Sequence, residues 1–367
     1  MTGKHNKSTM ESAGGVDEST LIGGSNAEIS SSAEISDNPR LTDQGGADRI
    51  NNISFWLKQR FGRKMIKLSI DGGFTCPNRD GSKGTGGCLF CGEGAGGDFA
   101  SDIDSQIRLY QTKWPDAGYI AYFQNHTNTY APVDVLRCKF YSALDDPRIS
   151  GIAIATRPDC LGLDEAAAGI AADDYDVAGQ AADHAAGRSS DVLDLLTEIN
   201  DKHFMWVELG LQTSNNKTAN LINRCYPTSV YDDAMDALNA RGIKTVTHLI
   251  LGLPGESEED MRRSVEHAIK KNTWGIKLHM LNVVRGSRLA DEMPDYVPFE
   301  SMEQYIDLVC DLIEIIPFGI TIHRLTADAP RSTLIAPEWS YMKRSILNGI
   351  HAELRRRGTY QGSRNSK

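Results

Sequence analysis

The sequence predicts an α/β fold in which a parallel sheet with helical crossovers forms an open or closed barrel. Six short apolar segments typical of buried strands lie between residues 65 and 281. A segment with helical periodicity separates each of them from the next, which requires right-handed crossovers between parallel strands. A chain of 367 residues with 40% apolar content can also fill a large core. Functional side chains are therefore expected at the carboxyl ends of the strands.

The predicted elements follow one another along the chain. A short aromatic-bearing helix begins near Ile53 and leads into the first strand. The predicted strands cover residues 65–70, 118–124, 151–155, 205–210, 244–251 and 275–281. The predicted helices between them cover residues 102–114, 132–144, 192–200, 230–241 and 258–271. Pro132 in a first turn and Gly242 after a last turn are typical helix-boundary residues.

The chain is expected to have three parts. Residues 1–47 are rich in Ser, Gly, Asn, Asp and Glu, and such a segment buries too little apolar surface to offset its ordering entropy, so a disordered tail is predicted. Residues 48–290 form the barrel, with an exposed Ala-rich insertion at 163–191 in one crossover. Residues 291–362, with helices at 303–316 and 341–357 and a strand at 321–325, form a C-terminal α/β extension packed on the barrel.

Composition limits the partners. A formal charge of −10 and a pI near 5.4 argue against broad electrostatic adhesion to nucleic acid, although they do not exclude an RNA substrate. The basic end of the last helix, residues 355–357, suits the helix dipole, with an RNA contact as the alternative. No apolar run is long enough to cross a bilayer, so no membrane partner is expected. Seven cysteines, an odd number, and the lack of an apolar signal-peptide core predict a cytoplasmic protein.

Three cysteines dominate the functional prediction. Eleven residues separate Cys76 from Cys88, and two separate Cys88 from Cys91, in a glycine-rich loop that follows the first predicted strand. Thiolates are ligands for soft metals, and the glycines let the loop bend so that the sulfurs converge. Three thiolates around a four-iron cluster leave one iron without a protein ligand, where chemistry can occur. A zinc site with a fourth Cys or His is an alternative, although zinc sites usually show two close ligand pairs.

The chain resembles radical S-adenosylmethionine (SAM) enzymes, whose usual cysteine loop has three and two residues between its cysteines. The longer first gap is shared with a bacterial subgroup of uncharacterised proteins related to the Elongator catalytic subunit and to oxygen-independent coproporphyrinogen oxidases. The resemblance runs from about residue 50 to 362. It includes five further blocks: YFQNHTNTYA (122–131), ATRPD (155–159), ELGLQT (208–213), LILGLPGE (249–256) and RLTADAP (324–330).

The resemblance implies a partial (β/α)6 barrel and two cofactors, a 4Fe-4S cluster and SAM. In such enzymes SAM chelates the open iron, and one-electron reduction releases a 5'-deoxyadenosyl radical that abstracts hydrogen from a substrate. An external one-electron donor such as flavodoxin or ferredoxin is implied. The substrate is not implied, although the likeness to the Elongator subunit suggests tRNA modification. A non-catalytic iron-sulfur protein on the same scaffold is the other alternative.

The resemblance also implies site residues. Cys76, Cys88 and Cys91 correspond to the cluster ligands. The positions that correspond to SAM contacts in the family are Gln124, Asn125, Thr127, Glu208, Gln212, Arg224, His248 and Gly252. This chain lacks the family's usual Gly-Gly pair after the second strand.

Several of these residues also have structural interpretations. Glu208 and Arg224 would pair across the barrel mouth, and His248 would be a hydrogen-bonded core residue. Gly252 and Gly255 would form an ordinary tight turn. The remaining cysteines are expected to be small buried apolar residues, although Cys225 beside Arg224 could lie near the site.

Overall fold

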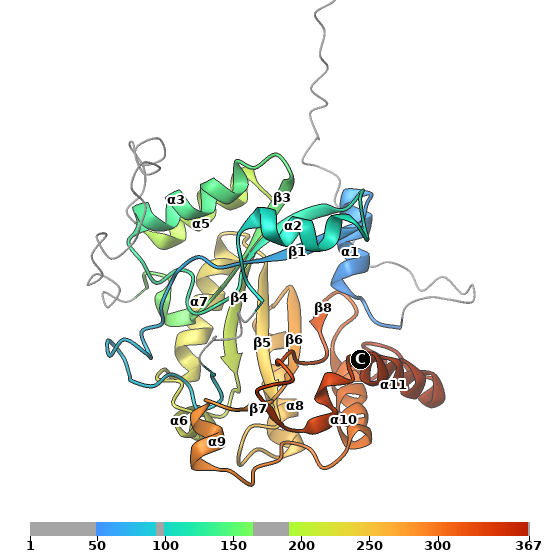
Figure 1. Ribbon diagram of the computed structural model, residues 1–367. Coiled ribbons are helices and arrows are strands. Elements are labelled where there is room, and N and C mark those ends of the chain that lie inside the picture. Colours follow the sequence, from blue (N-terminus) through green and yellow to red (C-terminus); the bar gives the residue numbers. More distant parts are fainter. Residues whose placement is uncertain (1–48, 93–98, 164–190, 366–367) are drawn as a thin grey trace, which may run out of the picture. The chain divides into compact units, whose positions relative to one another are not determined.

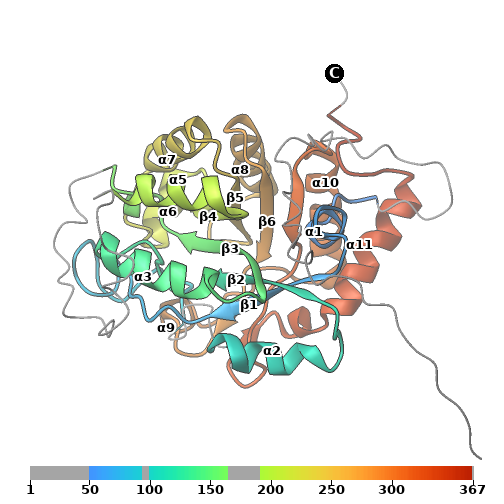
Figure 2. The same ribbon diagram turned by 90° about the horizontal axis from the view of Figure 1, so that it is seen from above.

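The computed structural model describes residues 49–92, 99–163 and 191–365. A single seven-stranded sheet organises them, and its strands follow chain order (Figure 1). These strands are β1 (Met65–Ile70), β2 (Gly118–Phe123), β3 (Ile149–Thr156), β4 (Met205–Gln212), β5 (Thr245–Leu251), β6 (Gly275–Met280) and β8 (Thr321–Arg324). Every neighbouring pair is parallel, and seen from above the strands follow a curve with helices outside it (Figure 2). The predicted fold, a partial α/β barrel, is confirmed.

The connecting helices lie close to their predicted positions. They are α2 (Ile103–Gln111), α3 (Val133–Leu144), α5 (Val192–Lys202), α7 (Thr228–Ala240) and α8 (Glu258–Lys270). Side-chain caps fix the starts of α2, α5 and α8, because the first backbone N–H groups of a helix lack intrahelical partners, whereas α3 and α7 begin after a proline without such a cap. Asp102 accepts a hydrogen bond from the Ser105 N–H, and Ser257 forms a reciprocal capping box with Asp260.

Several short elements escaped sequence analysis. They are α6 (Asn216–Leu221), α9 (Arg288–Glu292), the antiparallel pair β7 (Val283–Val284) and β9 (Leu334–Ala336), and the 3-10 helices Pro158–Cys160 and Glu338–Tyr341. Segments of two to six residues carry too little periodicity for a pattern to be read from the sequence.

The C-terminal region completes the sheet. Helix α10 (Met302–Ile315) leads into β8, which pairs with β6, and α11 (Lys343–Arg357) packs against α10. Helix α1 (Ile53–Phe61) contacts both edge strands, β1 and β8, and the backbone N–H of Ile322 donates to Asn51 O at 2.8 Å. The segment before β1 therefore lies beside the last strand of the sheet. The expected boundary at residue 290 remains a prediction.

The core has two parts. The outer face of the sheet packs against the helices through apolar side chains such as Leu68, Phe123 and Leu196. The inner face carries a separate apolar cluster, formed by Ile53, Leu57, Met65, Ile120, Tyr122, Ala153, Trp206 and Val246. Most of these residues come from α1 or from the amino-terminal halves of strands. This inner cluster fills the lower end of the barrel, so the polar residues are left to the carboxyl ends of the strands.

Two predictions concern residues outside the described ranges. The structure does not describe residues 1–47, for which a disordered tail was predicted. Nearly all of the predicted Ala-rich insertion (163–191) also lies outside the described residues. Within the part of the chain that the structure describes, no helix combines the length and the apolar character that a membrane crossing requires.

Candidate active site

The cysteine loop follows β1 and folds back on itself through backbone hydrogen bonds. Arg79 N–H donates to Cys76 O at 2.8 Å, and Gly87 N–H donates to Asn78 O at 2.8 Å. The loop is held from outside as well, because Leu89 N–H donates to Ile222 O at 2.9 Å. These bonds place the half-buried Cys76, Cys88 and Cys91 in one folded unit at the carboxyl end of β1.

The three thiols lie within electrostatic range of one another. Burial raises the pKa of Cys88 to about 12, and the neighbouring Cys91 and Cys76 add to the rise. Hydrogen-bond donors reach two of the sulfurs: Asn78 Nδ2 lies 3.5 Å from Cys88 Sγ, and Arg79 donates to Cys91 Sγ at 3.2 Å. Donors of this kind stabilise a thiolate once a metal has displaced its proton, and they tune the potential of an iron-sulfur cluster.

The described residues offer no ready position for a single metal ion. Across residues 49–92, 99–163 and 191–365, no three His, Cys, Asp or Glu side chains converge on a position for one metal ion. Structural zinc needs four ligands at 2.0–2.3 Å from a common point. A zinc site of this kind would need a fourth ligand beside the three thiols.

The turn after β2 brings predicted SAM contacts to the cysteine loop. Thr127 N–H donates to Thr75 O at 3.1 Å, next to Cys76. Asn125 Oδ1 and Thr127 Oγ1 are buried and have no hydrogen-bond partner among the described residues. Buried polar atoms are nearly always paired, so these two oxygens suit a ligand that donates hydrogen bonds. Gln124 lies on the sheet side of the turn and accepts from Ser69 Oγ at 3.2 Å.

Arg157 is a cation that sequence analysis did not select, although it belongs to the block at 155–159. It is buried at the end of β3, and its guanidinium donates two hydrogen bonds to Asp159, at 2.9 and 2.8 Å. It lies close enough to favour ionisation of the Cys88 thiol. A buried Arg paired with a carboxylate next to the thiols therefore gives this site a positive charge at a fixed position.

Arg224 and Gln212 shape the end of β4. Arg224 is fully buried, and its guanidinium donates to Thr213 O at 2.6 Å, Tyr226 O at 3.0 Å and Thr228 Oγ1 at 3.2 Å. Gln212 has a positive φ of 57°, and its side-chain amide lies 3.1 Å from Tyr226 Oη. Arg224 thus holds the backbone that presents Gln212 to the cavity described below.

Glu208 has a different partner from the one expected. It is 1% exposed and forms an ion pair with Lys277 on β6, and it accepts hydrogen bonds from Tyr122 Oη at 2.6 Å and Trp206 Nε1 at 3.0 Å. The pairing of Glu208 with Arg224 is therefore wrong, because the two side chains bind different partners. Burial favours the neutral acid, but the ammonium groups of Lys277 and Lys67 outweigh it and hold the pKa of Glu208 well below its usual range.

His248 faces the interior of the barrel. Its Nε2 is buried without a hydrogen-bond partner among the described residues, and its ring centroid lies 5.3 Å from that of His279. Burial lowers the pKa of His248 to about 3, and the nearby Lys277 lowers it further. His248 is therefore a neutral imidazole with a free nitrogen, which is not the hydrogen-bonded core residue considered as an alternative.

Gly252 packs closely against the C-terminal region. Its φ is +85°, and a Cβ there would stand 2.7 Å from Phe299 and 2.9 Å from Pro298. Gly255 also has a positive φ, +79°, but nothing lies within 4 Å of its missing Cβ. The close approach at Gly252 is thus to protein, and the conformation of this turn needs glycine at both positions.

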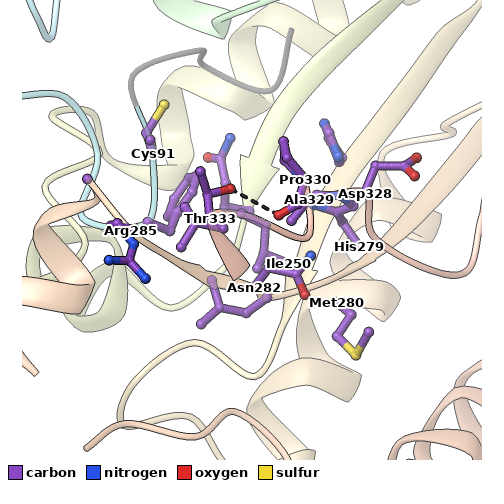
Figure 3. A pocket seen from close by; sticks show the side chains of 17 residues that line it. Cys91, Ile250, His279, Met280, Asn282, Arg285, Asp328, Ala329, Pro330 and Thr333 are labelled. Atoms are coloured by element: carbon purple, nitrogen blue, oxygen red, sulfur yellow. Dashed lines mark hydrogen bonds between the residues drawn. The ribbon is translucent and has the colours of Figure 1, made fainter. Parts of the chain in front are cut away.

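Two adjoining cavities occupy the carboxyl end of the barrel. The first, about 520 Å³, is lined by Cys91, Gln212, His248, Asn282 and Arg285 among others. In Figure 3, Cys91 lies on one side of it and His279 and Asp328 on the other. The second, about 400 Å³, is lined by Lys67, Tyr122, Gln124, Lys277 and Arg324 among others. His248, His279 and Asp328 line both cavities, so a ligand in one touches the walls of the other.

Comparisons with known proteins show which family the chain matches. A family model described as the radical SAM superfamily matches residues 81–268, and one described as the radical SAM C-terminal domain matches residues 273–356. The chain is 39% identical to the uncharacterised protein YtqA of Bacillus subtilis (strain 168), over 86% of this chain and 92% of that protein. It is 35% identical to protein YhcC of Escherichia coli (strain K12), over 79% of this chain and 87% of that protein.

A solved structure shares the fold. The archaeal Methanocaldococcus infernus Elp3, with its N-terminus deleted, superposes with a TM-score of 0.56 at 14% identity, over 81% of this chain. The match spans 64% of the Elp3 chain, which is less than two thirds of its length.

Proposed function

The chain belongs to the radical SAM superfamily, and on this premise we propose that it is an enzyme that binds a 4Fe-4S cluster through Cys76, Cys88 and Cys91. The observation that supports the proposal most directly is the folded cysteine loop, with three thiols in mutual range beside a cavity that Cys91 lines. When bound, the cluster and SAM together supply the chemistry, a one-electron cleavage that yields a 5'-deoxyadenosyl radical.

The protein's own residues hold and shield the cofactors. Asn78 and Arg79 donate to the sulfurs of Cys88 and Cys91, which would hold the cluster, and the Arg157 guanidinium lies nearby. The unpaired oxygens of Asn125 and Thr127 are proposed to accept hydrogen bonds from the SAM amine. Such contacts fix the orientation of SAM before the electron arrives.

The other predicted contacts divide into two groups. Gln124, Gln212 and His248 line the cavities and are proposed to touch SAM or substrate directly. Glu208, Arg224 and Gly252 are proposed to act indirectly. Glu208 fixes Lys277, Arg224 fixes the end of β4, and Gly252 lets the C-terminal region close on the barrel.

The test begins with anaerobic reconstitution of the full chain. The wild-type protein is expected to be brown, to hold about four irons, and on reduction with dithionite to convert SAM to 5'-deoxyadenosine. Cys88→Ala is expected to lose the cluster absorbance and this activity. The matched control is Cys310→Ala, which removes a buried thiol on α10 and should keep both.

Three results would contradict the proposal in different ways. A colourless protein with one zinc per chain would indicate an interaction module. A brown protein that leaves SAM intact would indicate an electron carrier or sensor. Retained SAM cleavage in Cys88→Ala would refute the ligand assignment.

The physiological electron donor is proposed to be a flavodoxin or a ferredoxin. Replacing dithionite by either protein with its reductase should sustain 5'-deoxyadenosine formation. The substrate class is addressed by comparing tRNA nucleosides and small metabolites from cells with and without the gene. A nucleoside that changes in the tRNA digest alone would identify tRNA as the substrate.

A further inference from the structure

The second cavity is built around charged side chains inside the barrel. Three cations line it: Lys67 on β1, Lys277 on β6 and Arg324 on β8. Tyr122 of β2 and Gln124, directly after β2, line it as well. These groups lie above the inner apolar cluster, which includes Met65, two residues before Lys67 on the same strand. The cavity is therefore lined by polar and cationic groups, although the interior of the barrel next to it is apolar.

Two of the three cations have acidic partners. Lys277 pairs with Glu208, which is buried directly behind the cavity wall. Arg324 pairs with Asp328 at 2.6 Å, and Asp328 also pairs with Lys343, whose side chain is 42% exposed at the rim. Lys277 and Arg324 thus each have an acidic partner within the protein, although Arg324 shares Asp328 with Lys343.

Lys67 is different. Within the described ranges its ammonium forms no hydrogen bond and no ion pair, and its close polar contact is the face of the Tyr122 ring, with Nζ 4.9 Å from the centroid. Glu208 acts on it only from beyond hydrogen-bond distance and Arg324 repels it. A cation away from bulk water without a partner is costly, and a cation–π contact offsets only part of that cost.

We propose that Lys67 binds a carboxylate group of the substrate in the second cavity. The inference rests on the proposed function, because it assumes that the barrel holds a substrate. Of the three cations that line the cavity, Lys67 is the one without an acidic partner among the described residues, and its single charge matches a carboxylate better than a phosphate dianion. Ser69 and Gln124, which also line the cavity, supply neutral hydrogen-bonding groups beside the ammonium.

The position of Lys67 also orients the rest of such a substrate. Since His248, His279 and Asp328 line both cavities, a molecule held at Lys67 extends toward the first cavity, where Cys91 lies. Anchoring one end of a substrate far from the reacting centre is an ordinary way to fix the reacting carbon in place. The anchor would thus select substrates with a carboxylate at one end.

The test measures binding of simple probes to the anaerobic, cluster-loaded protein by NMR titration. The probes are ¹³C-labelled acetate, its neutral isostere acetamide, and inorganic phosphate, all at constant ionic strength. Wild type is expected to bind acetate saturably and acetamide at least tenfold more weakly. Lys67→Met is expected to weaken acetate binding at least tenfold, because it removes the charge-assisted hydrogen bond. Lys58→Met, which removes an exposed lysine on α1, should leave acetate binding unchanged.

Folding and function are checked separately. Lys67→Met should keep the thermal midpoint of wild type or raise it, because a half-buried cation with no acidic partner among the described residues is replaced by an apolar side chain of similar length. The control variant Lys58→Met should keep the substrate-independent formation of 5'-deoxyadenosine. If wild type does not form 5'-deoxyadenosine, the proposed function is refuted, but the measured acetate binding still tests the role of Lys67.

Two outcomes would overturn the inference. Acetate binding that is absent in wild type, or equal in wild type and Lys67→Met, would show that Lys67 is not the anchor. If phosphate binds at least tenfold more tightly than acetate and this binding depends on Lys67, the group that Lys67 recognises is a phosphate and not a carboxylate.

Discussion

Glu208 is the residue on which the polar layer of the barrel depends. Its carboxylate accepts hydrogen bonds from Tyr122 and Trp206 and pairs with Lys277, and all of these side chains are buried. Burial lowers the pKa of Lys277 to about 7 although Glu208 favours its charged form. The charged form of Lys277 is therefore only marginally favoured inside the barrel, and it would be unfavourable without the Glu208 carboxylate.

A double-mutant cycle tests this coupling. Glu208→Gln should lower the free energy of unfolding by about 3 kcal/mol, because it leaves Lys277 as an uncompensated buried cation. Adding Lys277→Met should recover more than about 1 kcal/mol of that loss. Urea unfolding of the two single variants and the double variant gives the coupling energy. Strictly additive effects would show that the pair does not stabilise the barrel.

The strand ends are joined to one another at the level of elements. Glu256, in the turn between β5 and α8, accepts a hydrogen bond from Thr213 Oγ1, directly after β4. The Ser214 N–H donates to Ser264 Oγ of α8 at 2.9 Å. Burial raises the pKa of Glu256 to about 7, although the hydrogen bond from Thr213 opposes the rise. The turn therefore contains a carboxyl group that is protonated in mildly acidic solution.

This protonation makes stability depend on pH. Because the folded-state pKa of Glu256 lies above its ordinary value, its contribution is fully present below about pH 4.5 and is lost as pH rises through about 7. The stability of wild type relative to Glu256→Gln should therefore fall by about 2 kcal/mol between pH 5 and pH 8, after discounting for partial exposure. Denaturant unfolding at several pH values measures it. The exposed Glu258→Gln should show no such trend, and a flat difference for Glu256→Gln would refute the assignment.

At the scale of the whole molecule, the two ends of the described chain close the barrel together. The buried Gln361 accepts a hydrogen bond from Asn51 N–H at 2.9 Å and donates to Pro317 O at 2.9 Å and Ile320 O at 2.7 Å. Asn51 Nδ2 in turn donates to Phe318 O at 2.9 Å. One buried amide thus ties the segment before α1 to the segments around β8 and after α11.

Gln361→Ala tests this closure. The substitution leaves the Asn51 N–H and the Ile320 carbonyl without these partners, while Pro317 O keeps the hydrogen bond from the Ile320 N–H, so it should lower the free energy of unfolding by about 2–4 kcal/mol. Gln304→Ala, which removes an exposed amide that accepts from the Glu300 N–H, should cost less than about 1 kcal/mol. Thermal unfolding of both variants gives the comparison. Equal effects would mean that Gln361 is not a structural link.

Much of the fold was predictable because each regular element carries its own periodicity. The first strand was predicted at 65–70 and observed over the same residues, and the helix predicted at 132–144 runs from Val133 to Leu144. The antiparallel pair β7 and β9 was not predictable, because strands of two and three residues have no period to detect. The seventh strand of the sheet was predicted as a strand, but its place beside β6 was not.

The residues of the candidate site also differ in whether the sequence could predict them. The three cysteines were selected from sequence because they lie in one short segment whose chemistry can be read directly, whereas the polar turn after β2 was selected through the family resemblance. Arg157 could have been selected from the block at 155–159, where an Arg precedes Pro and Asp. The partner of Glu208 could not, since Lys277 lies 69 residues away on a strand that is not its neighbour in the sheet.

The sequence by itself determined the order of strands and helices and the three thiols, because these depend on local spacing and composition, and its short blocks carried the resemblance to the family. Only the tertiary structure decided which charges pair inside the barrel, why Gly252 must be glycine, and that Lys67 is left without an acidic partner among the described residues. Pairing is a property of distance in space, and the curvature of the sheet sets those distances between residues that the chain keeps far apart.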